Sequence, residues 1–231
     1  MFENYKPIVD TLQILSPTAH IGGGAVRDSL LKRPIRDVDL FIDSAVTDPA
    51  AQLLRSKFGF IKVSDWMAAG YYRKSVLELA RVATFEKADE TIPIQLIGLN
   101  GPTTMQQNIG RFDFGACMAG WDGDQVCTTE QFKIDVYNET FTLCRAESQW
   151  QYDNSMRRFQ KFTAERYAGW KLRVPSEFES FARDRLEKRA SLIAPLLDGL
   201  GEDDMKAVVH RATTLVRTNT DEKVIDLLKA A

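Results

Sequence analysis

Short runs of β-prone residues alternate with amphipathic segments along the chain up to about residue 150. The segment 5–15 places Ile8, Leu12 and Leu15 near helical spacing, whereas 37–42 is a compact run of β-prone residues bounded by charge. The pattern predicts helices over 5–15, 25–32 and 49–58, and strands over 20–21, 37–42, 60–63, 81–85 and 92–97. We therefore expect an α+β fold with a small mixed sheet flanked by helices.

After residue 150 the pattern becomes helical. Met156, Phe159 and Phe162 recur at helical spacing, and further helices are expected over 176–189, 203–217 and 221–228. This predicts a head domain over 1–150 and a short helical C-terminal region over 151–231. In that region Tyr167 and Trp170 either close a core or offer a platform on which a base stacks.

The most distinctive stretch of the chain begins with three consecutive glycines, Gly22, Gly23 and Gly24, between a predicted strand and a predicted helix. Glycines let the main chain approach a ligand closely, and exposed N–H groups at the following helix start favour an anion. A triphosphate is a natural occupant, to which Arg27 would add a charge-assisted contact.

Two carboxylates follow on the next predicted strand. Asp37 and Asp39 are two residues apart, so their side chains project to the same face. Such a pair can hold one or two Mg²⁺ or Mn²⁺ ions together with a substrate phosphate. The chemistry that this combination indicates is phosphoryl or nucleotidyl transfer.

Together these residues resemble a known signature. The run from Gly23 to Leu31, followed by Asp37-Val38-Asp39, is similar to the head-domain motif of class II tRNA nucleotidyltransferases and poly(A) polymerases, a family of the DNA polymerase β-type superfamily. A second segment, 111–119, resembles the family's RRDFTxNAMA motif, and 151–159 resembles its base-selecting helix. The resemblance implies a catalytic and metal-binding role for Asp37 and Asp39, and nucleotide binding by Gly23, Gly24, Arg27, Asp28, Arg111, Asp113 and Arg158.

The sequence also departs from the family pattern at three positions. Phe112 replaces the second arginine of the second motif, and Cys117 stands where the family has asparagine. Gln95 occupies the strand position where the family usually has an acidic residue, and an amide cannot supply that negative charge. Glu78 or Asp113 is then a candidate to complete the metal shell.

Composition and charge narrow the functional classes. With 30 basic and 32 acidic residues the chain has a net charge of −2, so any RNA contact must come from a local patch. Three cysteines without metal-ligand spacing and two histidines argue against zinc. Neither a signal-peptide core nor a membrane span is evident, which favours a cytoplasmic location.

The sequence as a whole predicts a template-independent nucleotidyltransferase. It would move a nucleoside monophosphate from ATP, CTP or another triphosphate to a hydroxyl, most readily an RNA or tRNA 3′ end, and release pyrophosphate. Three alternatives stay open: transfer to a protein or small molecule, a nucleotide- or RNA-binding module without turnover, and a purely structural interaction protein on the same scaffold.

Overall fold

The computed structural model describes residues 2–67, 79–88, 90–101, 103–185 and 187–188. The chain forms two compact units, residues 1–138 and 139–231. The first unit contains the glycine-rich run, the Asp37-Val38-Asp39 segment and the second motif. The second unit contains the helix that carries Arg158.

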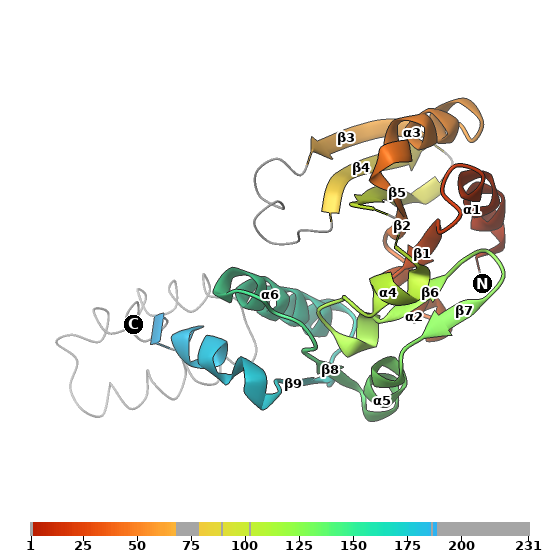
Figure 1. The fold of residues 1–231 in the computed structure, drawn as a ribbon. Helices are drawn as coiled ribbons and strands as arrows, with labels where there is room; N and C mark the ends of the chain where they lie inside the picture. The colour runs from red at the N-terminus through yellow and green to blue at the C-terminus, as the bar shows by residue number, and fades with distance from the viewer. Residues whose placement is uncertain (1, 68–78, 89, 102, 186, 189–231) are drawn as a thin grey trace, which may run out of the picture. The chain divides into compact units, whose positions relative to one another are not determined.

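A seven-stranded sheet forms the centre of the first unit (Figure 1), in the order β3-β4-β5-β2-β1-β6-β7. The strands β2 and β5 run parallel, and every other neighbouring pair is antiparallel. The strands are β1 His20–Gly22, β2 Val38–Asp43, β3 Ile61–Met67, β4 Leu79–Lys87, β5 Glu90–Leu99, β6 Ala119–Trp121 and β7 Val126–Thr128.

In the described part of the first unit five α-helices accompany the sheet, and two of them begin at recognisable sequence signals. Pro7 lies in the first turn of the first helix, where its missing N–H costs nothing. Thr104 caps the fourth helix, and Gln107 completes a reciprocal capping box. The helices are α1 Lys6–Gln13, α2 Gly24–Leu30, α3 Thr47–Ser56, α4 Met105–Ile109 and α5 Glu130–Asn138; short 3₁₀ turns span Glu3–Tyr5, Ser44–Val46 and Gly115–Cys117.

Alternation along β2, β4 and β5 gives the sheet two different faces. The buried face presents apolar side chains that are at most 1% exposed: Leu40, Ala83, Phe85, Ile94 and Leu96. Helix α3 contacts β3 and β5 and lies on this face, because a Cβ at Gly98 would be 2.7 Å from the Thr47 hydroxyl. The opposite face, here termed the site face, carries Asp39, Gln95, Thr84 and Ser64, all half-buried.

The second unit has a small aromatic core. Its strands β8 Thr140–Thr142 and β9 Lys171–Arg173 pair in parallel, and helix α6 spans Gln149–Glu165. The Phe141 ring packs against Tyr167 and Trp170, with centroid distances of 5.4 and 5.1 Å. Because Tyr167 is 0% and Trp170 7% exposed, the core interpretation of this pair is confirmed.

The α+β fold class predicted from the sequence is confirmed, and the predicted helices and strands of the first hundred residues are found with shifted ends. Of the helix predicted over 176–189, the structure shows a 3₁₀ turn at Ser176–Phe178 followed by a helix over 179–185. The helices predicted over 203–217 and 221–228 lie outside the described residues. In the part of the chain that the structure describes, no helix combines the length and the hydropathy needed to cross a bilayer.

Candidate active site

The glycine turn is shaped by close approaches of the neighbouring segments. Gly23 has a φ of 78°, which favours glycine, and its N–H donates to the Ala119 carbonyl at 2.8 Å. A Cβ at Gly22 would be 3.0 Å from the Phe41 ring and 3.3 Å from the Phe112 ring. The turn therefore depends on small residues, and segments 22–24 and 111–119 lie against each other.

A transverse row of residues extends from this turn across the site face. Gly22 pairs with Asp39 on β2, Asp39 with Gln95 on β5, Gln95 with Thr84 on β4, and Thr84 with Ser64 on β3. A Cβ at Gly23 would lie 3.7 Å from the Asp39 carboxylate oxygen Oδ2. The structure thus places Asp39 between the glycine turn and Gln95.

Asp37 is exposed and directly precedes β2, whereas Asp39 is the second residue of that strand, so the strand predicted over 37–42 begins one residue later and contains one of the two carboxylates. Mg²⁺ is commonly held in proteins by one or two carboxylates, with waters and substrate phosphates completing its shell. Asp37 and Asp39 fit that donor set. Among the described residues no group of three or more His, Cys, Asp or Glu side chains comes together as a metal cage. Glu78 lies outside the described residues.

Arg27 is completely buried, in contrast to the phosphate contact that its motif position implies. Its side chain is 0% exposed, and its Nε donates to Asp28 Oδ1 at 2.8 Å. Its Nη1 donates to Cys117 Sγ at 3.1 Å. The side chains of Arg27 and Asp28 therefore form an internal ion pair beneath the glycine turn. Cys117, at the family's asparagine position, links that pair to the second motif.

The second motif supplies an aromatic ring to the site. Phe112 packs against Phe41 with ring centroids 5.7 Å apart, and its edge borders both Gly22 and Gly23. Its neighbours Arg111 and Asp113 are exposed and half-buried, respectively. An aromatic side chain thus lies beside the glycine turn at the position where the family has its second arginine.

Arg158 belongs to the second unit. It lies on α6, is exposed, and its guanidinium carbon is 5.6 Å from the centroid of the Phe162 ring on the same helix. This geometry is typical of a cation–π contact within one helix turn. A nucleotide contact by Arg158 stays a prediction.

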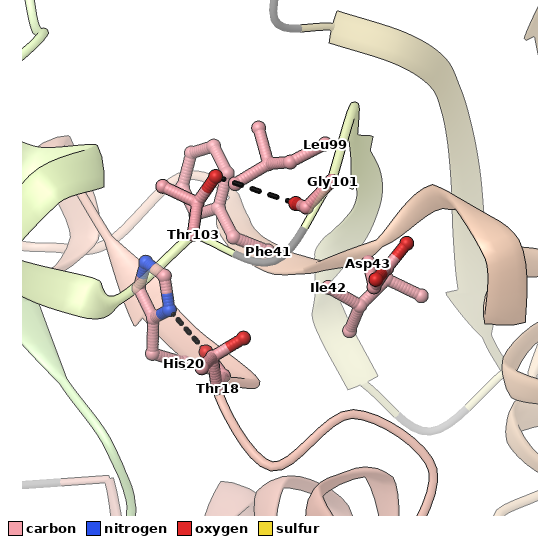
Figure 2. Close-up of a pocket in the computed structure, with 8 residues that line it drawn as sticks. All are labelled: Thr18, His20, Phe41, Ile42, Asp43, Leu99, Gly101 and Thr103. Atoms are coloured by element: carbon pink, nitrogen blue, oxygen red, sulfur yellow. Dashed lines mark hydrogen bonds between the residues drawn. The ribbon is translucent and has the colours of Figure 1, made fainter.

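The sequence did not single out His20, which lies in a small hollow at the other end of β2 (Figure 2). The hollow is lined by Thr18, His20, Phe41, Ile42, Asp43, Leu99, Gly101 and Thr103. His20 Nδ1 is 2.7 Å from the Thr18 carbonyl, which requires a proton on Nδ1, and Nε2 accepts from Asn108 Nδ2 at 2.9 Å. Burial lowers the pKa of His20 to about 4, so the imidazole is neutral.

This buried histidine predicts that the first unit loses stability in mild acid. The unfolded chain binds a proton at His20 below about pH 6.5, whereas the folded chain binds it only below about pH 4. The free energy of unfolding should therefore fall between pH 6.5 and pH 4, by about 3 kcal/mol from this group. Urea unfolding at pH 7 and pH 4.5 measures the loss. A His20→Gln variant should show a shallower loss; an equal loss in both proteins would contradict the assignment.

Comparison with solved structures shows which fold the chain shares. A tRNA-processing enzyme superposes with a TM-score of 0.56 at 15% identity, covering 81% of this chain and 47% of its own. A tRNA nucleotidyltransferase complexed with a primer tRNA and an ATP analogue gives 0.52 at 14% identity, covering 79% and 51%. The Bacillus stearothermophilus CCA-adding enzyme complexed with CTP gives 0.51 at 17% identity, covering 93% and 48%. The fold is thus that of the nucleotidyltransferase head, and the chain spans about half the length of these enzymes.

A comparison of the sequence with known protein families shows the family to which this chain belongs. Residues 2–138 match the Gabija anti-defense 2 (Gad2) family, and this chain belongs to that family. The match ends where the first compact unit ends. No curated protein matches the chain. The resemblance to class II tRNA nucleotidyltransferases therefore holds for the fold, whereas the family itself is Gad2; the family assignment made from the motifs alone is corrected accordingly.

Proposed function

We propose that this Gad2-family chain is a template-independent nucleotidyltransferase that moves a nucleoside monophosphate from a nucleoside triphosphate to a hydroxyl acceptor. The observation that supports the proposal best is the position of Asp39, between a glycine turn that can approach phosphates and a half-buried polar row. In this proposal the triphosphate binds at the glycine turn and the acceptor binds over the polar row, so the Asp39 carboxylate lies where the two reactants meet.

In this proposal the glycine turn binds the β- and γ-phosphates, and Asp37 and Asp39 hold Mg²⁺. When bound, the ion neutralises charge on the phosphates during transfer. Arg111 and Asp113, the sequence neighbours of Phe112, position the ribose or phosphates. The acceptor oxygen forms a new bond to the α-phosphorus while the bond to the β-phosphate breaks, pyrophosphate leaves, and the hydroxyl proton passes to solvent.

The similar solved structures suggest one acceptor, and the family suggests another context. One of the superposed enzymes is described in complex with a primer tRNA, which makes an RNA 3′ end the acceptor expected by analogy. The Gad2 description instead names an activity against a defence system called Gabija. Nucleotidyl transfer that inactivates a component of that defence is consistent with the proposed chemistry.

The proposal is tested by label transfer from each α-³²P nucleoside triphosphate, with Mg²⁺ or Mn²⁺, together with a pyrophosphate assay. Asp37- and Asp39-dependent pyrophosphate release with label on an acceptor would support it. Triphosphate binding without pyrophosphate release from any of the four nucleotides would overturn it and favour a binding module without turnover.

The rival of a binding module without turnover is motivated by Gln95, the direct neighbour of Asp39 in the parallel register. If the amide only weakens metal binding, Gln95→Glu should lower the Mg²⁺ concentration for half-maximal pyrophosphate release by about tenfold or more, because a third carboxylate adjoins the first two. Gln52→Glu on the exposed side of α3 is the matched control for added charge. An unchanged Mg²⁺ dependence in Gln95→Glu would show that Gln95 does not border the metal.

A further inference from the structure

The acceptor side of the candidate site has a distinctive chemistry. The transverse row continues past Asp39 as Gln95, Thr84 and Ser64, which all carry uncharged hydrogen-bonding groups and are half-buried. Neighbouring strands are about 4.8 Å apart, so the row extends roughly 14 Å from Asp39 to the edge strand β3. One pleat further along the same face, Phe41 and Ile97 belong to a buried apolar cluster, against which Val82 packs.

The geometry of the reaction assigns this row to the acceptor. In an in-line displacement the attacking oxygen and the leaving pyrophosphate lie on opposite sides of the phosphorus. The glycine turn lies on one side of Asp39 and Gln95 on the other. With the β- and γ-phosphates at the turn, the acceptor hydroxyl approaches from Gln95, and the rest of the acceptor extends over Thr84 and Ser64.

Charge on this face discriminates between acceptors. By alternation from the register, the described charged residues on the site face of strands β2 to β5 are all acidic: Asp39, Asp43 and Glu86. The cations of β3 and β4 project to the opposite face, where Lys62 Nζ pairs with Asp65 at 2.6 Å and Arg81 Nη2 with the same carboxylate at 2.5 Å. Arg81 also pairs with Asp48 of helix α3, and this helix covers the face opposite the site face.

Nucleic acid binding depends on cations that neutralise phosphates. Among the described residues, Lys32, Arg33 and Arg36 lie in the loop that leads into Asp37, and Arg111 directly precedes Phe112. In sequence these cations therefore adjoin residues that the proposed function assigns to the metal and the triphosphate. The described strand residues of this face comprise three acids and no Lys or Arg, so these strands themselves favour an uncharged acceptor over a polyanionic one.

We propose that the acceptor subsite is the row Gln95, Thr84 and Ser64, and that the acceptor is a hydroxyl of a protein rather than an RNA 3′ end. This inference rests on the proposed nucleotidyl transfer. Backbone amides and carbonyls of an extended protein segment match the uncharged donors and acceptors that are spaced along the row. The protein hydroxyl becomes a phosphodiester to the nucleoside monophosphate, and pyrophosphate is the other product.

The experiment offers the full chain α-³²P nucleoside triphosphates with two acceptors in parallel: the purified proteins of the Gabija defence and a total small-RNA pool. Label on a protein, with less than about threefold change in rate between 50 and 200 mM salt, is the expected result. Label on RNA, falling steeply over the same salt range, would overturn the acceptor assignment and leave the transfer chemistry standing. Failure to release pyrophosphate in either mixture would instead overturn the proposed function.

Variants locate the subsite independently. Thr84→Val and Ser64→Ala remove one hydroxyl each, and together they should raise the KM for the protein acceptor about tenfold while leaving the KM for the triphosphate unchanged. Ser56→Ala, at an exposed position of helix α3, is the matched control for loss of a serine hydroxyl. Thr84→Arg should lower transfer to protein. Two results would contradict the assignment. One is an unchanged KM for the protein acceptor in the double variant. The other is a Thr84→Arg protein that labels RNA more strongly and labels protein as well as the parent does.

Discussion

Asp39→Asn is expected to lower nucleotidyl transfer by about a thousandfold while the first unit stays folded. The substitution preserves the size of the side chain and removes the charge of the carboxylate that lies between the glycine turn and Gln95. Loss of a charge that stabilises phosphoryl transfer costs on the order of 4 kcal/mol in the barrier. Radiolabel transfer under single-turnover conditions measures the chemical step directly.

The matched control is Asp43→Asn, on the same strand and the same face. Asp43 accepts from the Ala45 N–H at 2.9 Å, a cap that asparagine can also provide. This variant should keep the rate of the parent within about threefold. Equal losses in the two variants would show that strand β2 is perturbed as a whole. An Asp39→Asn protein with undiminished transfer would exclude Asp39 from the metal site.

The sequence predicted the beginning of the candidate site well because its parts are adjacent in the chain. The glycine turn, α2 and β2 occupy 22 to 43, and each has a strong local signal in glycine, apolar spacing or β-branched residues. Prediction of Gln95 beside Asp39 needed the family resemblance, because the parallel register between β2 and β5 joins residues far apart in sequence.

Other parts of the fold have no local signal of sufficient length. Strands β6, β7, β8 and β9 have three residues each, and α4 has five. In segments this short, neither the two-residue alternation of a strand nor the 3.6-residue period of a helix repeats often enough to be recognised. These short elements nevertheless close the site: β6 accepts the Gly23 N–H, and α4 precedes Phe112. The polar row ending at Ser64 likewise follows from a register shift between Lys62 and Ser64 in β3, which alternation alone would not predict.

The role of Cys117 follows from its contacts in the structure and not from its position in the motif. In the sequence it is a substitution at the family's asparagine position. In the structure it is 2% exposed and accepts a hydrogen bond from Arg27. The thiol therefore contributes to the packing under the glycine turn, and Arg27, expected at the triphosphate from its motif position, is its partner.

Arg27→Met is accordingly expected to cost stability rather than triphosphate contacts. The guanidinium is buried and paired with Asp28, whose side chain is 3% exposed. Removing one member of a buried ion pair leaves the other charge without compensation and costs about 3–5 kcal/mol. Urea unfolding of the first unit measures the loss. For the protein that remains folded at low temperature, the KM for the triphosphate should stay within about threefold of the parent.

The double variant Arg27→Met/Asp28→Leu separates the two interpretations of this pair. Replacing both members of a buried ion pair with apolar residues of similar size is often neutral, so the double variant should recover most of the stability lost in Arg27→Met. A guanidinium that contacts the triphosphate would behave differently, because removing Asp28 cannot restore a phosphate contact. Recovered stability together with an unchanged triphosphate KM would establish Arg27 as a positioning residue beneath the glycine turn. A KM raised a hundredfold or more in both variants would instead place its side chain at the phosphates, and would imply that the turn opens when the nucleotide binds.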